Sequence, residues 1–244
     1  MKEEGLNMNN KGKYGYLAKN TLLFTISSFG SKILTFLLVP LYTAILSTSD
    51  YGTADLISTT ATLLIYIFTI NIADSVMRFT IDKNKKDGVF SYSIKILLLG
   101  SIMLMLFLVP FAFENILEWN RYCYVFLFIN FFLVASNQIL INYLRGIDKI
   151  KEVAVAGILT TVFTIVSNIV LLVLFNWGLL GYLISTVVGV TISSLYVCLC
   201  IRNDIGKLLF EQSSLQTRKE MRQYSIPLIF NGIAWWINNS LDKY

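Results

Sequence analysis

The sequence predicts an all-α membrane protein, a polytopic helix bundle with an N-terminal six-helix lobe followed by the first helix of a second lobe. Three observations predict this fold class. Hydrophobic residues make up 55% of the chain and charged residues only 14%. Uncharged segments of 18 residues or more recur along the chain, and a helix needs ~20 apolar residues to cross a ~30 Å hydrocarbon core. Lys and Arg are concentrated in every second connection, as expected of a multi-span protein.

The first three spans follow the first three apolar segments. Residues 20–46 are apolar apart from Lys32. Residues 53–79 and 89–113 each contain an uncharged run of 18 residues. Because such a run nearly covers the hydrocarbon core, each of these segments is expected to form one continuous helix.

The second half of the chain predicts four further spans. A fourth span is expected at 121–144, where Arg121 is the only charged residue. Residues 153–201 carry no charge and are long enough for two helices. The polar tripeptide Asn176-Trp177-Gly178 divides this run. The remaining expected spans are therefore 152–175, 178–201 and 225–242.

The distribution of basic residues predicts the orientation of the bundle, because basic connections remain in the cytoplasm. Seventeen of the 20 Lys and Arg residues lie in the N-terminal segment 1–19, or in the connections after the second, fourth and sixth spans and the span ends beside them, and Arg121 alone lies on the opposite side. The N-terminus is therefore expected in the cytoplasm. Residues 20–201 form the first lobe, 202–224 a basic cytoplasmic connection, and 225–244 the start of the second lobe.

The composition excludes several function classes. The chain contains no histidine, which is the usual general base and the commonest metal ligand, and its acidic residues form no metal-ligating cluster. No glycine motif for phosphate binding is present. The net charge of +5 is explained by basic loops that face anionic membrane lipids, so no nucleic-acid partner is expected. The sequence thus predicts no enzyme activity, no metal and no cofactor.

Charged residues inside the first two spans are the first candidates for a functional site, because charges at membrane depth are costly. Lys32 lies about 18 Å into its span, too deep for its side chain to reach an interface easily. Asn71, Asp74 and Arg78 share one face of the second span, and Asp74 is spaced to pair with Arg78. Two interpretations stay open for each charge: a contact with a ligand, or a structural role as an ion pair or interfacial anchor. For Asp74, coupling to a proton or sodium ion is a further alternative.

The fourth span adds a second polar face. Asn142 and Arg145 are three residues apart, Gln138 lies four residues before Asn142, and Asn137 adjoins Gln138. Such amides either contact a substrate or form hydrogen bonds between neighbouring helices. Both interpretations stay open from the sequence alone.

Three segments together resemble the bacterial polysaccharide biosynthesis proteins of the O-antigen-type oligosaccharide flippase family. The first is similar to that family's first span and outer loop, the second to the end of its second span, and the third to the start of its second lobe. The segments are Leu17–Leu22 with Phe29–Leu34, Val39–Thr43 and Asp50–Gly52; Asn71–Phe79; and Ser225–Asn231 with Ala234–Ser240 and Asp242–Tyr244.

The resemblance implies a transporter of the multidrug/oligosaccharidyl-lipid/polysaccharide exporter superfamily, in the bacterial cytoplasmic membrane. Its substrate would be an undecaprenyl-diphosphate-linked oligosaccharide for cell-surface polysaccharide such as O-antigen, lipopolysaccharide or exopolysaccharide. Lys32, Arg78 and Lys243 match basic positions of the motifs and would line a cationic cavity between two six-helix lobes. Arg145 is added to this set from helix spacing, and Asn231 is expected among the polar residues of the cavity.

The chain departs from the family in length, because about twelve spans are expected and only about seven are present. We therefore expect a truncated family member. Two other functions stay open: a drug or cation antiporter of the same superfamily, which would need a carboxylate-lined cavity, and a non-transporting scaffold in a polysaccharide-assembly complex, with a polymerase or glycosyltransferase as partner.

Overall fold

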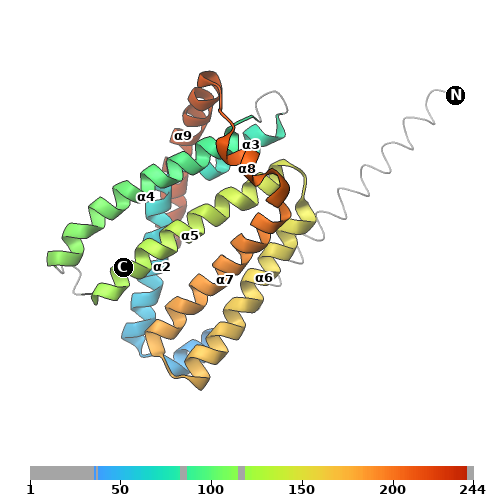
Figure 1. The fold of residues 1–244 in the computed structure, drawn as a ribbon. Coiled ribbons are helices and arrows are strands. Elements are labelled where there is room, and N and C mark those ends of the chain that lie inside the picture. Colours follow the sequence, from blue (N-terminus) through green and yellow to red (C-terminus); the bar gives the residue numbers. More distant parts are fainter. Residues whose placement is uncertain (1–35, 37, 83–86, 115–118, 241–244) are drawn as a thin grey trace.

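The computed structural model describes residues 36, 38–82, 87–114 and 119–240 (Figure 1). Residues 38–45, in the first expected span, are helical, and no strand is present in the described ranges. The predicted all-α class is confirmed. The elements that follow are α2 (Thr48–Phe68), α3 (Ile72–Ile81), α4 (Val89–Glu114), α5 (Arg121–Gly146), α6 (Ile150–Asn168), the π-helical segment η1 (Ile169–Leu174), α7 (Gly178–Cys200), α8 (Arg202–Phe210) and α9 (Leu215–Ser240).

The second expected span is broken into two helices, which differs from the continuous helix predicted for 53–79. The axes of α2 and α3 are bent by 59° relative to one another. At the break, Ile70 has a φ of 48° and Asn71 a φ of 50°, in the left-handed region that ends a right-handed helix. The segment 53–79 contains no Gly or Pro, so the usual sequence signals of a break are missing.

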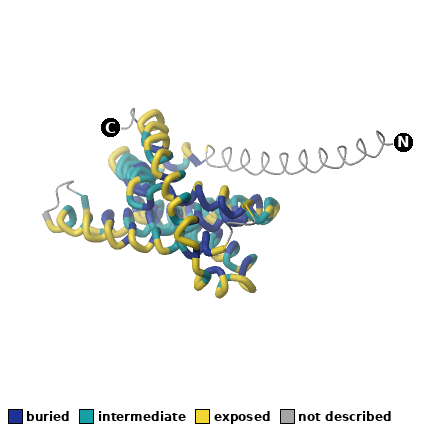
Figure 2. The backbone as a smooth tube through the Cα atoms, turned by 90° about the horizontal axis from the view of Figure 1, so that it is seen from above, coloured by how far each residue is buried: buried dark blue, intermediate teal, exposed yellow. Residues whose placement is uncertain are grey.

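Four helices within the described ranges, α4, α5, α6 with η1, and α7, are long and apolar enough to cross a membrane, and the bent α2–α3 pair makes a fifth if it is counted as one span. Many large apolar side chains are exposed, as on the outward face of α4, where Leu106 is 70% and Phe113 80% exposed. Figure 2 shows such exposed positions on the outer faces of the helices and buried ones turned inward. Exposed apolar faces of this extent are suited to lipid.

The expected basic connection 202–224 is largely helical. It contains α8 and the first ten residues of α9, which begins at Leu215 rather than at the expected residue 225. Ser214 begins α9 as an N-terminal cap, because its hydroxyl accepts a hydrogen bond from the backbone N–H of Thr217 at 3.0 Å. The seventh expected span is therefore the later part of a longer helix.

Helix α5 is at the centre of the described bundle and packs against α2, α3, α4, α6 and α7 (Figure 1). Its apolar face is fully buried, with Leu127, Phe131 and Ile139 each at most 2% exposed. Helix α9 packs against α2 and α3. Helices α5 and α9 therefore both adjoin the bent α2–α3 pair.

Helices α6 and α7 form a close-packed pair (Figure 1). A Cβ atom at Gly189 of α7 would collide with the Thr164 hydroxyl of α6 and lie 2.7 Å from the Thr160 carbonyl oxygen. Only glycine permits this approach of the two backbones.

Candidate functional site

A polar cavity lies where the break between α2 and α3 faces α5. Its volume is about 290 Å³. Six residues that the sequence analysis singled out for a site line this one cavity, although they come from two helices far apart in the chain. The lining residues are Tyr66, Asn71, Asp74, Asn137, Gln138, Ile141, Asn142 and Arg145.

Hydrogen bonds hold the polar cavity in shape. The Asn71 amide donates to the Asp74 carboxylate at 2.9 Å. The buried Asn142 amide donates to the backbone carbonyl of Ala73 at 2.9 Å and so joins α5 to the first turn of α3. The Arg145 guanidinium donates to the Asn142 side-chain oxygen at 3.1 Å. Asn142 therefore connects the arginine to the broken span.

Asn137, on the α5 side of the polar cavity, joins that helix to α7. Its amide donates to the hydroxyls of Ser193 at 3.1 Å and Ser194 at 3.0 Å, both on α7. Asn137 and Asn142 thus both make the interhelical bonds that the structural interpretation expects, and both also line the cavity.

The polar cavity combines one cation, one carboxylate and several amides. A guanidinium carries five N–H donors in a planar fork, which suits a carboxylate or phosphate. Arg145 donates to Asn142 and is only half-buried, so a polar ligand in the cavity can reach its guanidinium. No group of three or more His, Cys, Asp or Glu side chains suited to a metal ion occurs among the described residues.

Arg78 lies in a second cavity, between α3 and α9. The guanidinium carbon of Arg78 is 4.3 Å from the centre of the Tyr224 ring, a cation–π contact. The expected Asp74–Arg78 pair does not form, because Asp74 is turned toward Asn71 and Arg78 toward Tyr224. This second cavity has a volume of about 250 Å³ and is lined by Arg78, Phe79, Asp82, Glu220, Gln223 and Tyr224.

A third cavity, the α2–α9 cavity, lies on the other side of the polar cavity. Its volume is about 520 Å³. Tyr66 lines both the α2–α9 cavity and the polar cavity. The three cavities therefore follow one another along the bent α2–α3 pair. The α2–α9 cavity is lined by Asp55, Ser58, Thr59, Thr62, Tyr66, Trp235, Trp236, Asn239 and Ser240.

Three other residues were named in the sequence analysis. Lys32 and Lys243 lie outside the described residues. Asn231 is exposed on α9 and lines none of the three cavities.

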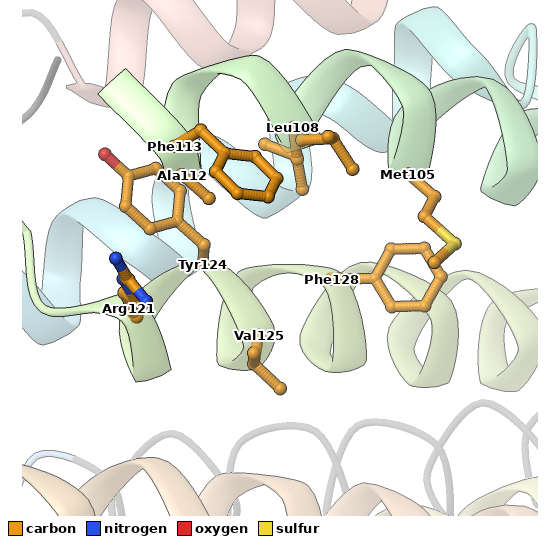
Figure 3. Close-up of a pocket in the computed structure, with 9 residues that line it drawn as sticks. Met105, Leu108, Ala112, Phe113, Arg121, Tyr124, Val125 and Phe128 are labelled. Atoms are coloured by element: carbon orange, nitrogen blue, oxygen red, sulfur yellow. The ribbon is translucent and has the colours of Figure 1, made fainter. Parts of the chain in front are cut away.

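A fourth cavity, between α4 and α5, has a different character. It measures about 390 Å³, and side chains such as Met105, Leu108, Phe113 and Phe128 make it almost entirely apolar. Figure 3 shows these side chains converging from the two helices, with Arg121 at one end. It includes none of the residues singled out for a site, so we do not assign it to the candidate site.

The cavities include residues that sequence reasoning missed, namely Tyr66, Tyr224, Trp235 and Trp236. The four are aromatic, and aromatic residues in an apolar span give no periodic signal of their own. Only the packing of α9 against α2 and α3 brings them to the site.

The comparisons with known proteins agree with this architecture. A sequence profile of the family described as polysaccharide biosynthesis protein matches residues 17–244. A crystal structure of MATE in complex with MaD3S superposes with a TM-score of 0.67 at 14% identity, over 88% of this chain and 53% of that chain. The search of curated proteins found no match.

A second solved structure is similar in the same way. It is the outward-facing conformation of a multidrug resistance MATE family transporter of the MOP superfamily, with a TM-score of 0.58 and 15% identity, over 88% of this chain and 50% of that chain. The present chain thus spans about half the length of these two proteins and shares their fold over that half. On the match across residues 17–244, the chain belongs to the polysaccharide biosynthesis protein family.

Proposed function

We propose that this chain is one lobe of a flippase that moves an undecaprenyl-diphosphate-linked oligosaccharide across the bacterial cytoplasmic membrane by alternating access. The observation that carries the proposal is the polar cavity, in which the Arg145 guanidinium lies among amides and one carboxylate inside the helix bundle. A diphosphate at membrane depth requires paired cations, because leaving it unpaired incurs a large desolvation cost. Family membership supports a role in polysaccharide synthesis.

The arrangement of the cavities supports a route along the bent pair. Arg78 and Arg145 line successive cavities on α3 and at its junction with α2. With the N-terminus in the cytoplasm, as the basic loops favour, Arg78 is nearest the cytoplasmic face. A lipid diphosphate would then meet Arg78 first and Arg145 next. Lys32 and Lys243 remain proposed members of the same cationic set.

An antiporter for organic cations is the second candidate, and one observation favours it. The α2–α9 cavity combines the Asp55 carboxylate with three aromatic rings, which is chemistry that also suits a cation. The arginines of the neighbouring cavities oppose this function, because they would repel such a ligand on the same route.

Binding of undecaprenyl diphosphate to the purified chain in nanodiscs tests the proposed function. We expect Arg145→Ala to weaken binding by about tenfold or more, since a hydrogen bond to a charged group contributes about 1.5–3 kcal/mol. Arg121→Ala is the matched control, because Arg121 lies in the apolar cavity between α4 and α5. Equal affinities for the unaltered chain and Arg145→Ala would contradict the proposal.

A further inference from the structure

We propose that the α2–α9 cavity binds the sugar portion of the lipid-linked cargo, with Trp235 as the stacking surface. This inference rests on the proposed function and deepens it, because it assigns the phosphate and sugar parts of one ligand to two neighbouring cavities. The chemistry of the lining residues, their hydrogen bonding and their charge each support it.

The aromatic side chains of the cavity provide flat apolar surfaces. Trp235 is 59% exposed, so most of its ring is accessible. Trp236 and Tyr66 line the same cavity. A pyranose ring presents a face of C–H groups surrounded by hydroxyls, and an indole face matches the C–H part of that surface. Large aromatic rings also contribute contact area at low entropic cost.

The hydroxyl groups of α2 are prepared to accept hydrogen bonds. Ser58 donates to the Ala54 carbonyl and Thr62 to the Ser58 carbonyl, each at 3.0 Å. A hydroxyl that donates its only proton keeps acceptor lone pairs. Together with the carboxylate of Asp55, these oxygens form a row of acceptors for sugar hydroxyls along one face of α2.

The charge of the α2–α9 cavity argues against binding of the phosphate end of the ligand in this cavity. Its described lining includes the carboxylate of Asp55 and no Lys or Arg. A phosphate would be repelled there, whereas a neutral polyhydroxyl group would not. The phosphate is matched instead by Arg145 in the adjoining polar cavity.

The stacking surface is held in place by contacts between α9 and α2. The Trp236 indole N–H donates to the Thr59 carbonyl at 2.8 Å. A Cβ atom at Gly232 would lie 2.6 Å from the Tyr66 ring, so the two helices meet closely there. The Asn239 amide donates to the Trp235 carbonyl at 2.8 Å. Trp236 is therefore a positioning residue, and Trp235 is left to contact the ligand.

Tyr66 divides the two cavities and lines both. A ligand with its diphosphate at Arg145 and its sugars on Trp235 would pass beside the Tyr66 ring. The inference therefore predicts separable contributions: Arg145 acts on every lipid diphosphate, and Trp235 acts only when sugars are attached.

The test compares two radiolabelled lipids binding to the chain in nanodiscs: bare undecaprenyl diphosphate, and the same lipid carrying the oligosaccharide of the cells that produce the protein. We expect the sugars to tighten binding to the unaltered chain by about five- to tenfold. Trp235→Ala should remove this increment and leave the affinity for the bare lipid within about twofold of the unaltered value. Trp235→Phe should keep part of the increment.

Controls separate the possible failures. Trp177→Ala changes an exposed tryptophan at the η1–α7 turn and should leave both affinities unaltered. Equal binding of the two lipids, or an increment that survives Trp235→Ala, would overturn the sugar assignment while the proposed function stands. If neither lipid binds the unaltered chain, the proposed function fails as well. A Trp235→Ala effect confined to tetraphenylphosphonium, an organic cation, would overturn the inference in favour of the antiporter.

Discussion

The bent α2–α3 pair and the close-packed α6–α7 pair both carry polar residues in apolar surroundings, but they use them differently. In α6 and α7, hydroxyls such as those of Thr160 and Ser185 donate to carbonyls four residues earlier in their own helix, at 3.0 and 2.7 Å. In the bent pair, Asn71 and Asp74 stand at a break in the backbone and line a cavity.

The two regions differ in how many of their hydrogen-bond donors are satisfied within one helix, and in how closely the helices pack. A hydroxyl bonded within its own helix needs no partner, and glycine at a facing position lets the backbones close on one another. An amide or guanidinium has more donors than its helix can accept. Hydroxyls opposite a glycine therefore indicate packing, whereas amides and a guanidinium beside a helix break indicate a candidate binding cavity.

The largest expected effect is in the packed region. Gly189→Ala should destabilise the protein by about 2 to 3 kcal/mol, because the new methyl group meets a hydroxyl and a backbone carbonyl that cannot both withdraw. Reversible unfolding in mixed micelles measures this loss.

Gly206→Ala in α8 is the matched control for Gly189→Ala. No atom lies within 4 Å of a Cβ atom at Gly206, so alanine there should be neutral or stabilise by up to about 1 kcal/mol through helix propensity. If the two variants were equally stable, the close approach of α6 and α7 would be wrong.

The second effect concerns the break itself. Asn71→Val should cost about 1 to 2 kcal/mol, because a β-branched residue is strained at a φ of 50°. Asn71→Gly should retain the backbone and lose only the bond to Asp74. Unfolding free energies of both variants provide the comparison, and a valine variant as stable as the glycine variant would argue for a continuous helix.

The long helices could be predicted from the sequence because their uncharged runs have clear ends. The expected spans 89–113, 121–144 and 178–201 agree closely with α4, α5 and α7. The break could not be predicted, since the only favourable residue for a left-handed backbone in that stretch is Asn71 itself. The start of α9 could not be predicted either, because its first turns are as polar as a loop.

The candidate site could be predicted in parts but not as a whole. Spacing groups Asn71 with Asp74, and Asn142 with Arg145, but it does not indicate that α3 and α5 meet. Tyr66 and Asn71 would point about 140° apart on a continuous helix, and the break brings both to one cavity. Local sequence patterns likewise could not predict that α9 packs against α2 and α3.

A smaller effect is expected where α5 meets the break. Asn142→Leu removes the bond to the Ala73 carbonyl, and the interhelical bonds of membrane proteins contribute about 1 kcal/mol. The same change removes the acceptor of Arg145, so binding of undecaprenyl diphosphate should change together with stability.

Ser193→Ala is the comparison for Asn142→Leu. It removes one of the two acceptors of Asn137 and should affect stability less, since Ser194 remains. The reverse order would contradict the role of Asn142.

The smallest effect concerns the end of the cavity series, where Arg78 lies over Tyr224. Tyr224→Leu should cost about 0.5 kcal/mol, the usual contribution of an exposed cation–π pair. Tyr224→Phe keeps the ring and should cost less.

Both variants should be compared with and without Arg78→Ala in double-mutant cycles, because the coupling between the two residues isolates the contact from the packing of Tyr224 on Phe79. A coupling that appears in the cycle with Tyr224→Leu but not in the cycle with Tyr224→Phe would assign the interaction to the aromatic face. No coupling in either cycle would mean that Arg78 is held instead by the carboxylates that share its cavity.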